Sequence, residues 1–375
     1  MLLGISGGIL KPKVRKMSSL HKFYQGRKVF LTGHTGFKGT WLTRILLQFG
    51  ADVVGYALAP ETEPSLFEKT NTSSQIHSII ADVRDREKLI SAMKEAKPDI
   101  VFHLAAQPLV LTGYKDPVGT YETNVMGTVN FLEAVRQSPS VKSCVNVTTD
   151  KVYLNKEWVW GYRENEELCG YDPYSNSKSC SELVTHSYKN SFFCEPGSPA
   201  ISTARSGNVI GGGDYATDRI IPDCIRATFE GKTILLRNPH STRPYQHVLE
   251  CLRGYLVLAQ KQYEDTSFAG SYNFGPDDES CVSTGNLATL FCEQWGSGVQ
   301  WETVATSNAP HEANFLKLDC SKAKATLGWY PQWGIQDAVK KIVEWERMVQ
   351  KGVSAAEATD TQIGEYFGEG NGRKK

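Results

Sequence analysis

The sequence has no excess charge of either sign, because its 41 Lys and Arg residues are balanced by 41 Asp and Glu residues. Without a basic field, nothing in the composition attracts nucleic acid or an anionic membrane over long range. The chain also lacks an uncharged apolar run long enough to cross a bilayer. We therefore expect a protein that binds neither nucleic acid nor membrane.

Paired cysteines are also missing, since the nine cysteines are scattered singly and form no CxxC motif. An odd and unpatterned set in a long chain argues against a disulfide framework and against a zinc site. It is typical of thiols in a reducing compartment, so we expect a cytoplasmic protein without a bound metal.

The apolar residues 1–10 precede their basic neighbours, the reverse of a secretory signal. We expect residues 1–26 to form a disordered N-terminal tail.

Internal repeats are absent, and what the sequence does contain is an alternation of short apolar segments with amphipathic helical segments. This pattern predicts an α/β fold with a doubly wound parallel Rossmann sheet over residues 27–206, completed by a strand near 271–275. Residues 207–350 are glycine-rich and irregular, and they predict a smaller mixed α/β substrate-binding lobe. Residues 351–375 are expected to be a C-terminal tail.

Two long amphipathic helices are expected beside the predicted sheet. The first carries Tyr121, Val125, Val129, Leu132 and Val135 at helical spacing. The second spans residues 174–193, and Leu183 and Val184 should face inward.

A glycine-rich turn follows the first predicted strand. Val29, Phe30 and Leu31 lead into Gly33, Gly36 and Gly39, after which apolar residues recur at helical spacing as far as Phe49. In a parallel sheet such a turn can hold a pyrophosphate, because glycines allow close approach and the first N–H groups of the helix face the anion. The alternative is an ordinary strand-to-helix turn.

Tyr174 and Lys178 stand four residues apart on a predicted helix and therefore share one face. A nearby ammonium and an oxidised nicotinamide would both favour the phenolate, so Tyr174 could remove a hydroxyl proton while hydride leaves the same carbon. The alternative is an exposed Tyr and Lys on an amphipathic helix. The position of the motif after a glycine turn and a strand ending in threonines favours the catalytic interpretation.

Thr149, Asp150 and Lys151 follow the fifth predicted strand. The Thr149 hydroxyl could bond a substrate oxygen and the Tyr174 phenol. Asp150 and Lys151 could be an acid and a base for a second reaction step, or charged residues of a surface loop. Spacing alone does not decide between these.

Taken together, these motifs resemble the extended short-chain dehydrogenase/reductases, and within them the nucleotide-sugar 4,6-dehydratases. The likeness covers roughly residues 27–350. It rests on GHTGFKG (33–39), GYALAP (55–60), HLAAQPLV (103–110), YETNVMGT (121–128), VTTDKVY (147–153), GYREN (161–165), DPYSNSK (172–178), GNVIGGGD (207–214), IPDCIR (221–226) and RPYQHVLE (243–250). TDK, HTGFKG and RPxQHV are specific to the branch that acts on CDP-glucose.

The resemblance implies an NAD-dependent lyase that oxidises the sugar at C4, eliminates water across C5 and C6, and returns the hydride to C6. It assigns catalysis to Thr149, Asp150, Lys151, Tyr174 and Lys178. It assigns cofactor binding to Gly33, Thr35, Gly36, Phe37, Gly39, Asp82, Val83, Leu104, Ala105, Ala106, Asn124, Tyr174 and Lys178. It assigns substrate binding to Gln107, Asn208, Arg219, Arg243 and His247. It also implies a homodimer or homotetramer, with dimers formed through the helices of 119–137 and 174–193.

Within this resemblance, Tyr174 takes the proton of the 4-hydroxyl, Lys178 lowers the pKa of Tyr174 and holds the nicotinamide ribose, and Asp150 protonates the departing 6-hydroxyl. Lys151 occupies the place of the glutamate base in relatives that act on dTDP-glucose. A lysine can be a base only when neutral, so Lys151 is either the C5 base or a group that orients a water.

The chain departs from the family pattern at two places. Leu111, Thr112 and Gly113 stand where arginine and serine are expected. Tyr56–Leu58 lacks the acidic residue that would bind the adenosine 2′-hydroxyl, so a preference for NAD over NADP rests on the family likeness.

Two other functions remain open at this point. A nucleotide-sugar 4-epimerase would use the same Tyr, Lys and Thr but has no use for an acid–base pair at Asp150 and Lys151. A non-enzymatic NAD(H)-sensing module would have lost Tyr174 or Lys178, and this chain keeps both.

Overall fold

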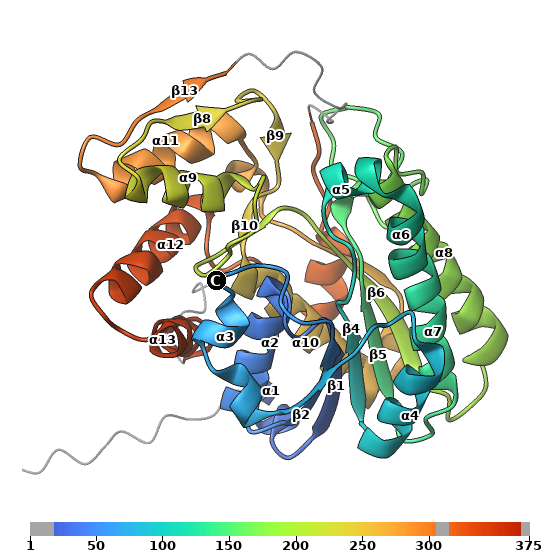
Figure 1. The fold of residues 1–375 in the computed structure, drawn as a ribbon. Coiled ribbons are helices and arrows are strands. Elements are labelled where there is room, and N and C mark those ends of the chain that lie inside the picture. Colours follow the sequence, from blue (N-terminus) through green and yellow to red (C-terminus); the bar gives the residue numbers. More distant parts are fainter. Residues whose placement is uncertain (1–18, 305–314, 369–375) are drawn as a thin grey trace, which may run out of the picture.

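The computed structural model describes residues 19–304 and 315–368. Its centre is a seven-stranded parallel sheet with the strand order β11-β6-β5-β4-β1-β2-β3 (Figure 1). The strands are β1 (Lys28–Thr32), β2 (Asp52–Ala57), β3 (His77–Ile80), β4 (Ile100–His103), β5 (Ser143–Val147), β6 (Ala200–Ser206) and β11 (Ser271–Phe274). The order reverses between β1 and β4, so the predicted doubly wound sheet is confirmed.

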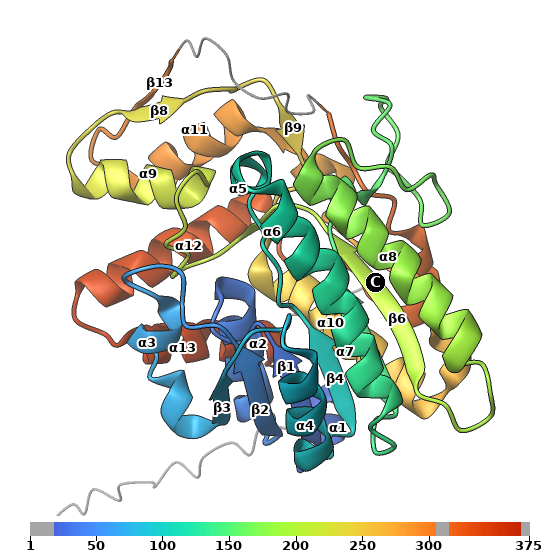
Figure 2. The ribbon, with the colours of Figure 1, turned by 45° about the vertical axis from the view of Figure 1, so that its right-hand side comes forward.

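Helices cover both faces of the sheet (Figures 1 and 2). One face is covered by α1 (Ser19–Tyr24), α2 (Phe37–Gln48), α10 (Val248–Glu264) and α13 (Ala355–Phe367). The other is covered by α4 (Arg86–Ala96), α6 (Pro117–Tyr121), α7 (Gly127–Arg136) and α8 (Pro173–Phe192). Because both faces are covered, the central strand β1 is a continuous apolar run, and its Val29, Phe30 and Leu31 are completely buried.

The prediction that residues 1–26 and 351–375 are tails is wrong for the helical parts of both segments. Tyr24 of α1 is buried, and its hydroxyl donates a hydrogen bond of 2.9 Å to the Leu256 carbonyl of α10. Ile363 and Tyr366 of α13 are buried, and α13 packs against α2 and α12 (Ile335–Gln350). These short helices are held by tertiary packing rather than by their own propensity. Residues 1–18 and 369–375 lie outside the described residues.

The two long helices also differ in detail from the prediction. The first is continuous from α6 to α7 but contains a π-helical turn, η2 (Glu122–Met126). In α8, Val184 packs against the buried core while Leu183 is 54% exposed, so the inward orientation predicted for Leu183 is wrong.

A smaller lobe lies beyond the carboxyl ends of the strands and has a core of its own (Figure 2). Its helices are α9 (Ile220–Phe229), α11 (Thr284–Trp295) and α12. Its strands pair as β7 (Val209–Ile210) with β10 (Gln246–His247), β9 (Thr242–Arg243) with β12 (Val282–Ser283), and β8 (Ile234–Leu236) with β13 (Trp301–Thr303). The remaining elements are α3 (Leu66–Lys69), α5 (Val110–Lys115), η1 (Thr72–Gln75), η3 (Asp150–Val152), η4 (Thr266–Phe268), η5 (Asp278–Ser280) and η6 (Ala323–Leu327).

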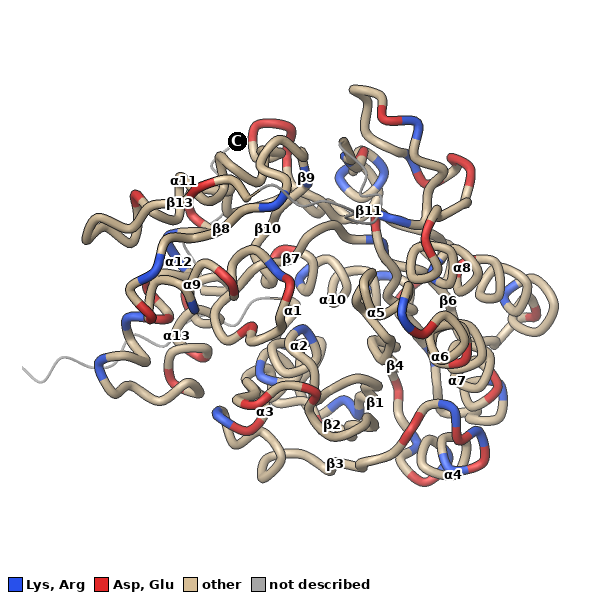
Figure 3. Tube along the Cα trace, turned by 45° about the horizontal axis from the view of Figure 1, so that its top comes forward, with Lys and Arg blue, Asp and Glu red and all other residues tan. Residues whose placement is uncertain are grey.

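Charges of both signs are interspersed along the chain trace (Figure 3). Across residues 19–304 and 315–368, no helix combines the length and the apolar character that crossing a bilayer requires. All nine cysteines lie in the described part of the chain, and each is a free thiol.

Glu346 of α12 is a buried carboxylate that faces the glycine-rich loop before α9. Its Oε1 lies 3.5 Å from the Gly213 backbone nitrogen. Burial raises the pKa of Glu346 to about 7, although the Gly213 N–H and the charge of Lys69 both act to lower it. The native state therefore keeps a proton that an unfolded glutamate, with a pKa near 4.5, has already lost. Consequently this residue makes the free energy of unfolding fall as the pH rises between those two values.

Replacing Glu346 with Gln is expected to abolish that dependence. Above about pH 7 the variant should be more stable than the original chain by on the order of 3 kcal/mol, because one pKa unit corresponds to about 1.4 kcal/mol. The difference should shrink as the pH falls toward the pKa of the unfolded carboxyl. Denaturant titrations at several pH values measure it. Asp337→Asn, at an exposed position of the same helix, is the control. If the difference in the free energy of unfolding between Glu346→Gln and the original chain does not change with pH, the prediction is contradicted.

Candidate active site

A cavity of about 1700 Å³ opens where the carboxyl ends of the central strands meet the smaller lobe. It exceeds the roughly 300–1000 Å³ that is usual for one small ligand, and it can therefore take a dinucleotide and a second nucleotide together. The turns after β1, β4, β5 and β6 line its floor, and the loop before α9 lines the opposite wall.

The glycine turn after β1 forms one end of this cavity. Gly33 has a φ of +77°, and a Cβ there would lie 2.6 Å from the Ala105 backbone nitrogen. A Cβ on Gly39 would lie 2.0 Å from the Gly33 carbonyl oxygen. Helix α2 then begins at Phe37, and no side chain caps its first N–H groups. These N–H groups and the bare backbone form the cradle that a pyrophosphate requires.

Most of the predicted cofactor residues line the same cavity: Thr35, Gly36, Phe37, Asp82, Val83, Leu104, Ala105 and Ala106, in addition to Gly33 and Gly39. The Thr35 hydroxyl donates to the Leu58 carbonyl at 2.8 Å and so holds the turn against the end of β2. Burial acts to raise the pKa of Asp82, but the hydrogen bonds and the charge of Arg84 lower it on balance. Asp82 is therefore an anion held by Arg84 at the rim of the cavity.

Asn124 does not line the cavity, and the structure places it behind the wall. Its Oδ1 accepts a hydrogen bond of 2.8 Å from the Gln107 backbone N–H, and its Nδ2 donates to the Ser177 hydroxyl of α8, also at 2.8 Å. The π-helical turn η2 carries Asn124, and such turns are frequent at functional sites. The residue thus joins the segment after β4 to the helix that carries Tyr174, and direct cofactor contact is not its role here.

Tyr174 and Lys178 face the cavity from one side of α8. The helix starts at Pro173, and the carboxylate of Asp172 caps it by accepting from the Ser175 N–H at 3.0 Å. Burial raises the pKa of Tyr174 to about 12, although the Thr149 side chain acts to lower it. Burial and the charge of Lys38 lower the pKa of Lys178 to about 8. The Lys178 ammonium donates to the Val147 carbonyl at 3.2 Å, which ties α8 to the end of β5.

Thr149, Asp150 and Lys151 form the turn that leaves β5. Asp150 Oδ1 accepts from the Thr149 hydroxyl at 3.0 Å and pairs with Lys151 Nζ at 3.2 Å. Lys151 and Thr149 line the cavity, whereas Asp150 is fully buried behind them. Within the described residues, Asp150 Oδ2 has no hydrogen-bond partner. The two charged groups therefore form a contact pair at the cavity floor, and the surface-loop interpretation does not fit this geometry.

Four of the five predicted substrate residues line the cavity: Gln107, Asn208, Arg219 and Arg243. The prediction for His247 is wrong. Its imidazole is completely buried, caps α10 by accepting from the Leu249 N–H at 3.3 Å, and packs against the rings of Trp41 and Trp333. The sequence placed His247 beside Arg243 in one motif, but the residue lies where β10 ends and α10 begins, facing inward.

Lys38 lines the cavity but was not assigned from the sequence. Lys38 is half-buried at the start of α2, and its Nζ donates to the Ser206 hydroxyl at 3.3 Å. A lysine inside a glycine turn was the available signal. Gly113, one of the departures from the family pattern, lies against α8, and a Cβ there would come within 3.1 Å of the Tyr174 backbone nitrogen. The small residue lets α5 pack directly on the helix of Tyr174.

Residues 19–304 and 315–368 contain no cluster of three or more His, Cys, Asp or Glu side chains arranged to hold a metal ion. The polar groups in the cavity are instead hydroxyls, ammonium groups, guanidinium groups and carboxylates.

Comparison with known proteins places this arrangement among nucleotide-sugar enzymes. The family model described as GDP-mannose 4,6 dehydratase matches residues 30–342. The chain is 49% identical to a CDP-glucose 4,6-dehydratase of Salmonella typhimurium, over 92% of this chain and 97% of that protein. It is 25% identical to a dTDP-glucose 4,6-dehydratase of Escherichia coli, over 85% of this chain and 92% of that protein.

Solved structures show the same fold at lower identity. One is dTDP-glucose 4,6-dehydratase from Bacillus anthracis in complex with NAD, with a TM-score of 0.72, 20% identity, and coverage of 86% of this chain and 97% of that chain. Another is UDP-glucose-4-epimerase from Stenotrophomonas maltophila with bound NAD and formylated UDP-arabinopyranose, with a TM-score of 0.74, 21% identity, and coverage of 87% and 99%.

Proposed function

Since the chain belongs to the GDP-mannose 4,6-dehydratase family of extended short-chain dehydrogenase/reductases, we propose that it is a CDP-glucose 4,6-dehydratase. It is an NAD-dependent hydro-lyase, and its products are CDP-4-keto-6-deoxyglucose and water. The observation that carries the proposal is the Asp150–Lys151 contact pair, which lies beside Tyr174 and Thr149 in one cavity. An epimerase needs Tyr174 and Thr149 but has no use for the Asp150–Lys151 pair.

The cavity residues fit NAD. Gly33 and Gly39 leave room for a pyrophosphate that a Cβ at either position would fill, and the uncapped start of α2 faces it. Asp82, Val83 and Leu104–Ala106 line the same cavity and would hold the rest of the dinucleotide, and Lys178 would bind the nicotinamide ribose. When bound, NAD accepts hydride from C4 of the sugar and later returns it to C6.

Tyr174 and Thr149 handle the proton at the sugar 4-oxygen. Desolvation raises the pKa of the phenol to about 12, so in the free protein it holds its proton, and this pKa has to fall before the phenol can act as a base. The Thr149 side chain acts to lower the pKa of the phenol, and a positive charge brought into the cavity acts in the same direction. Lys178 has a pKa of about 8, so near neutral pH its ammonium adds a further positive charge on the same face of α8.

Asp150 and Lys151 carry the elimination step. An ion pair has neither a free acid nor a free base, but the Asp150 Oδ1 to Lys151 Nζ contact of 3.2 Å allows a proton to pass from the ammonium to the carboxylate. That single transfer yields a neutral amine that can take the C5 proton and a carboxylic acid that is the proton source for the departing 6-hydroxyl, with the proton reaching the cavity through the neighbouring Thr149 or Lys151 side chain. Lys151 is 28% exposed and reaches the cavity, whereas Asp150 lies behind it.

The opposite wall is suited to the CDP part of the substrate. Arg219 and Arg243 offer guanidinium groups for the diphosphate, and Asn208 presents an amide with a buried Oδ1 that has no hydrogen-bond partner within the described residues. Arg219 is held by Asp214 at 3.0 Å. Gln107 has its side chain engaged by Thr120 and the Leu109 N–H, so it shapes the wall more than it reaches for ligand.

A dimer or tetramer in the cytoplasm completes the proposal. Val118 and Met126 on the α6–α7 helix and Leu183 on α8 expose more than half of their surface. Apolar residues gathered on neighbouring helices are typical of subunit contacts. The free state of all nine cysteines supports a reducing compartment. Light scattering in solution measures the mass of the assembly.

Incubation with NAD and either CDP-glucose or dTDP-glucose tests the function. We expect CDP-glucose to give the base-labile absorbance of a 4-keto sugar, with loss of the 6-hydroxyl seen by NMR, and dTDP-glucose to react more slowly. Conversion of CDP-glucose to its 4-epimer with the 6-hydroxyl intact would identify an epimerase instead. No product from either nucleotide sugar would overturn the assignment.

A further inference from the structure

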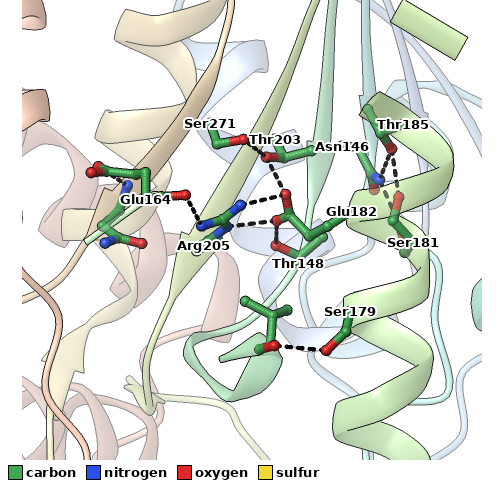
Figure 4. A network of polar contacts seen from close by, with 12 residues as sticks. Asn146, Thr148, Glu164, Ser179, Ser181, Glu182, Thr185, Thr203, Arg205 and Ser271 are labelled. Carbon is green, nitrogen blue, oxygen red and sulfur yellow. Dashed lines mark hydrogen bonds and ion pairs between the residues drawn. The ribbon is translucent and has the colours of Figure 1, made fainter. Parts of the chain in front are cut away.

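The five predicted catalytic residues are carried by two separate elements. Tyr174 and Lys178 lie on α8, whereas Thr149, Asp150 and Lys151 lie on the turn after β5. Their chemistry depends on how these two elements are placed relative to each other. The structure shows a buried polar network at that junction (Figure 4).

Glu182 is the centre of this network, and it lies one helical turn beyond Lys178. Its side chain is 2% exposed, yet its two oxygens accept hydrogen bonds from three partners. The Thr148 hydroxyl donates to Oε1, and the Thr203 hydroxyl donates to Oε2 at 2.7 Å. Arg205 Nε and Nη2 each donate at 2.9 Å, one to each oxygen. The carboxylate thus binds α8 to Thr148, the residue directly before Thr149.

Arg205 of β6 carries the network to the other end of the catalytic turn. Its Nη1 donates to the Tyr153 hydroxyl at 2.8 Å and to the Glu164 carbonyl at 3.0 Å. The Tyr153 hydroxyl in turn donates to Asn273 Oδ1 of β11 at 2.7 Å. Both flanks of the segment Thr149–Val152 are therefore held, Thr148 by Glu182 and Tyr153 by Arg205.

Stability alone does not account for such a pair. A buried ion pair pays a large desolvation cost, and apolar side chains of similar volume are often as stabilising or more so. What apolar side chains cannot supply is direction, because a bidentate guanidinium–carboxylate contact fixes both partners in distance and angle. Fixed geometry is what a catalytic turn needs, since a misplacement of about 1 Å can cost about 100-fold in rate.

We propose that Glu182 and Arg205 are positioning residues that set the placement of Tyr174 and Lys178 against Thr149, Asp150 and Lys151. They touch no substrate atom, since neither lines the cavity. The expected change in kcat rests on the proposed function. The expected change in hydrogen exchange does not. It predicts that weakening the pair lowers the rate of the chemical steps without weakening substrate binding.

The test compares Glu182→Gln, Arg205→Lys and Tyr153→Phe with the original chain, and uses Arg44→Gln as a matched control. Arg44 forms another largely buried pair, with Asp360 of α13, and does not line the cavity. Each variant is measured for thermal stability, for kcat and KM with CDP-glucose per folded enzyme, and for amide hydrogen exchange over residues 148–153.

We expect Glu182→Gln to lower kcat by about 10- to 100-fold while KM changes little. Arg205→Lys and Tyr153→Phe should lower it less, because each keeps part of the network. Exchange over 148–153 should accelerate in all three variants. Arg44→Gln should lose stability while kcat and exchange in that segment stay unchanged.

An unchanged kcat and unchanged exchange in Glu182→Gln and Tyr153→Phe would overturn the inference, as would an equal acceleration of exchange in Arg44→Gln. If Glu182→Gln does not fold, Tyr153→Phe decides, because it removes one hydroxyl and keeps the ring packed on Tyr162. If the original chain fails to convert CDP-glucose, the proposed function falls, whereas the exchange measurements still test the positioning role.

Discussion

Replacing Tyr174 with Phe is expected to lower the turnover of CDP-glucose by about 10²- to 10⁴-fold, the range typical of losing a general acid–base group. The change removes the only proton-accepting atom of this side chain and leaves a ring of nearly the same volume in a half-buried position on the cavity wall. Folding and nucleotide binding should therefore be retained. The rate of C4 oxidation, followed in a single turnover by the absorbance of reduced nicotinamide, should fall in parallel with kcat.

Tyr188→Phe is the matched control for this experiment. Tyr188 lies on the same helix, and its hydroxyl donates to Glu133 at 3.0 Å, remote from the cavity. It should turn over CDP-glucose at the original rate. A Tyr174→Phe enzyme that oxidises C4 normally would remove Tyr174 from the mechanism and leave Thr149 or Lys178 to accept the proton.

Replacing Lys151 with Met is expected to separate the two halves of the reaction. C4 oxidation depends on Tyr174 and Thr149, so a pulse of reduced nicotinamide should still form. Removal of the C5 proton should slow by about 10²- to 10⁴-fold, because the side chain that accepts it is gone. Incorporation of solvent deuterium at C5, measured by NMR, should fall by the same factor as product formation.

Lys156→Met, on the exposed loop that follows the catalytic turn, controls for the loss of a positive charge near the site. Asp150→Asn serves as the complementary variant, and it should slow both C5 exchange and loss of the 6-hydroxyl, because it removes the carboxylate that takes the Lys151 proton. Deuterium exchange at the original rate in Lys151→Met would contradict the base role and would favour Lys151 as a group that orients a water.

Much of the catalytic set is visible in the sequence because each of its parts is local. Gly33 directly follows a strand, and Gly39 lies in the first turn of the next helix, where a Cβ would meet the Gly33 carbonyl of the same short turn. Tyr174 and Lys178 share a face because four residues make about one helical turn. Local spacing therefore decides which residues a motif brings together.

His247 and Asp150 show where local reasoning fails. Both sit in motifs that resemble cavity residues, yet the packing of Trp41 and Trp333 encloses His247, and the residues around Gly207 enclose Asp150. Burial depends on contacts with residues that are distant in the chain, so a short sequence motif cannot predict it. The same holds for α1 and α13, which are ordered by the helices they cover.

The sequence by itself determined the order of strands and helices, the glycine turn and the candidate reacting groups, because hydrophobic period and short-range spacing are properties of neighbouring residues. Only the tertiary structure decided that Lys38 approaches Lys178, that Asp150 lies behind Lys151, and that Glu182 and Arg205 join α8 to both flanks of the turn after β5. Each of these contacts is made between different elements, and its geometry exists only once the sheet has brought those elements together.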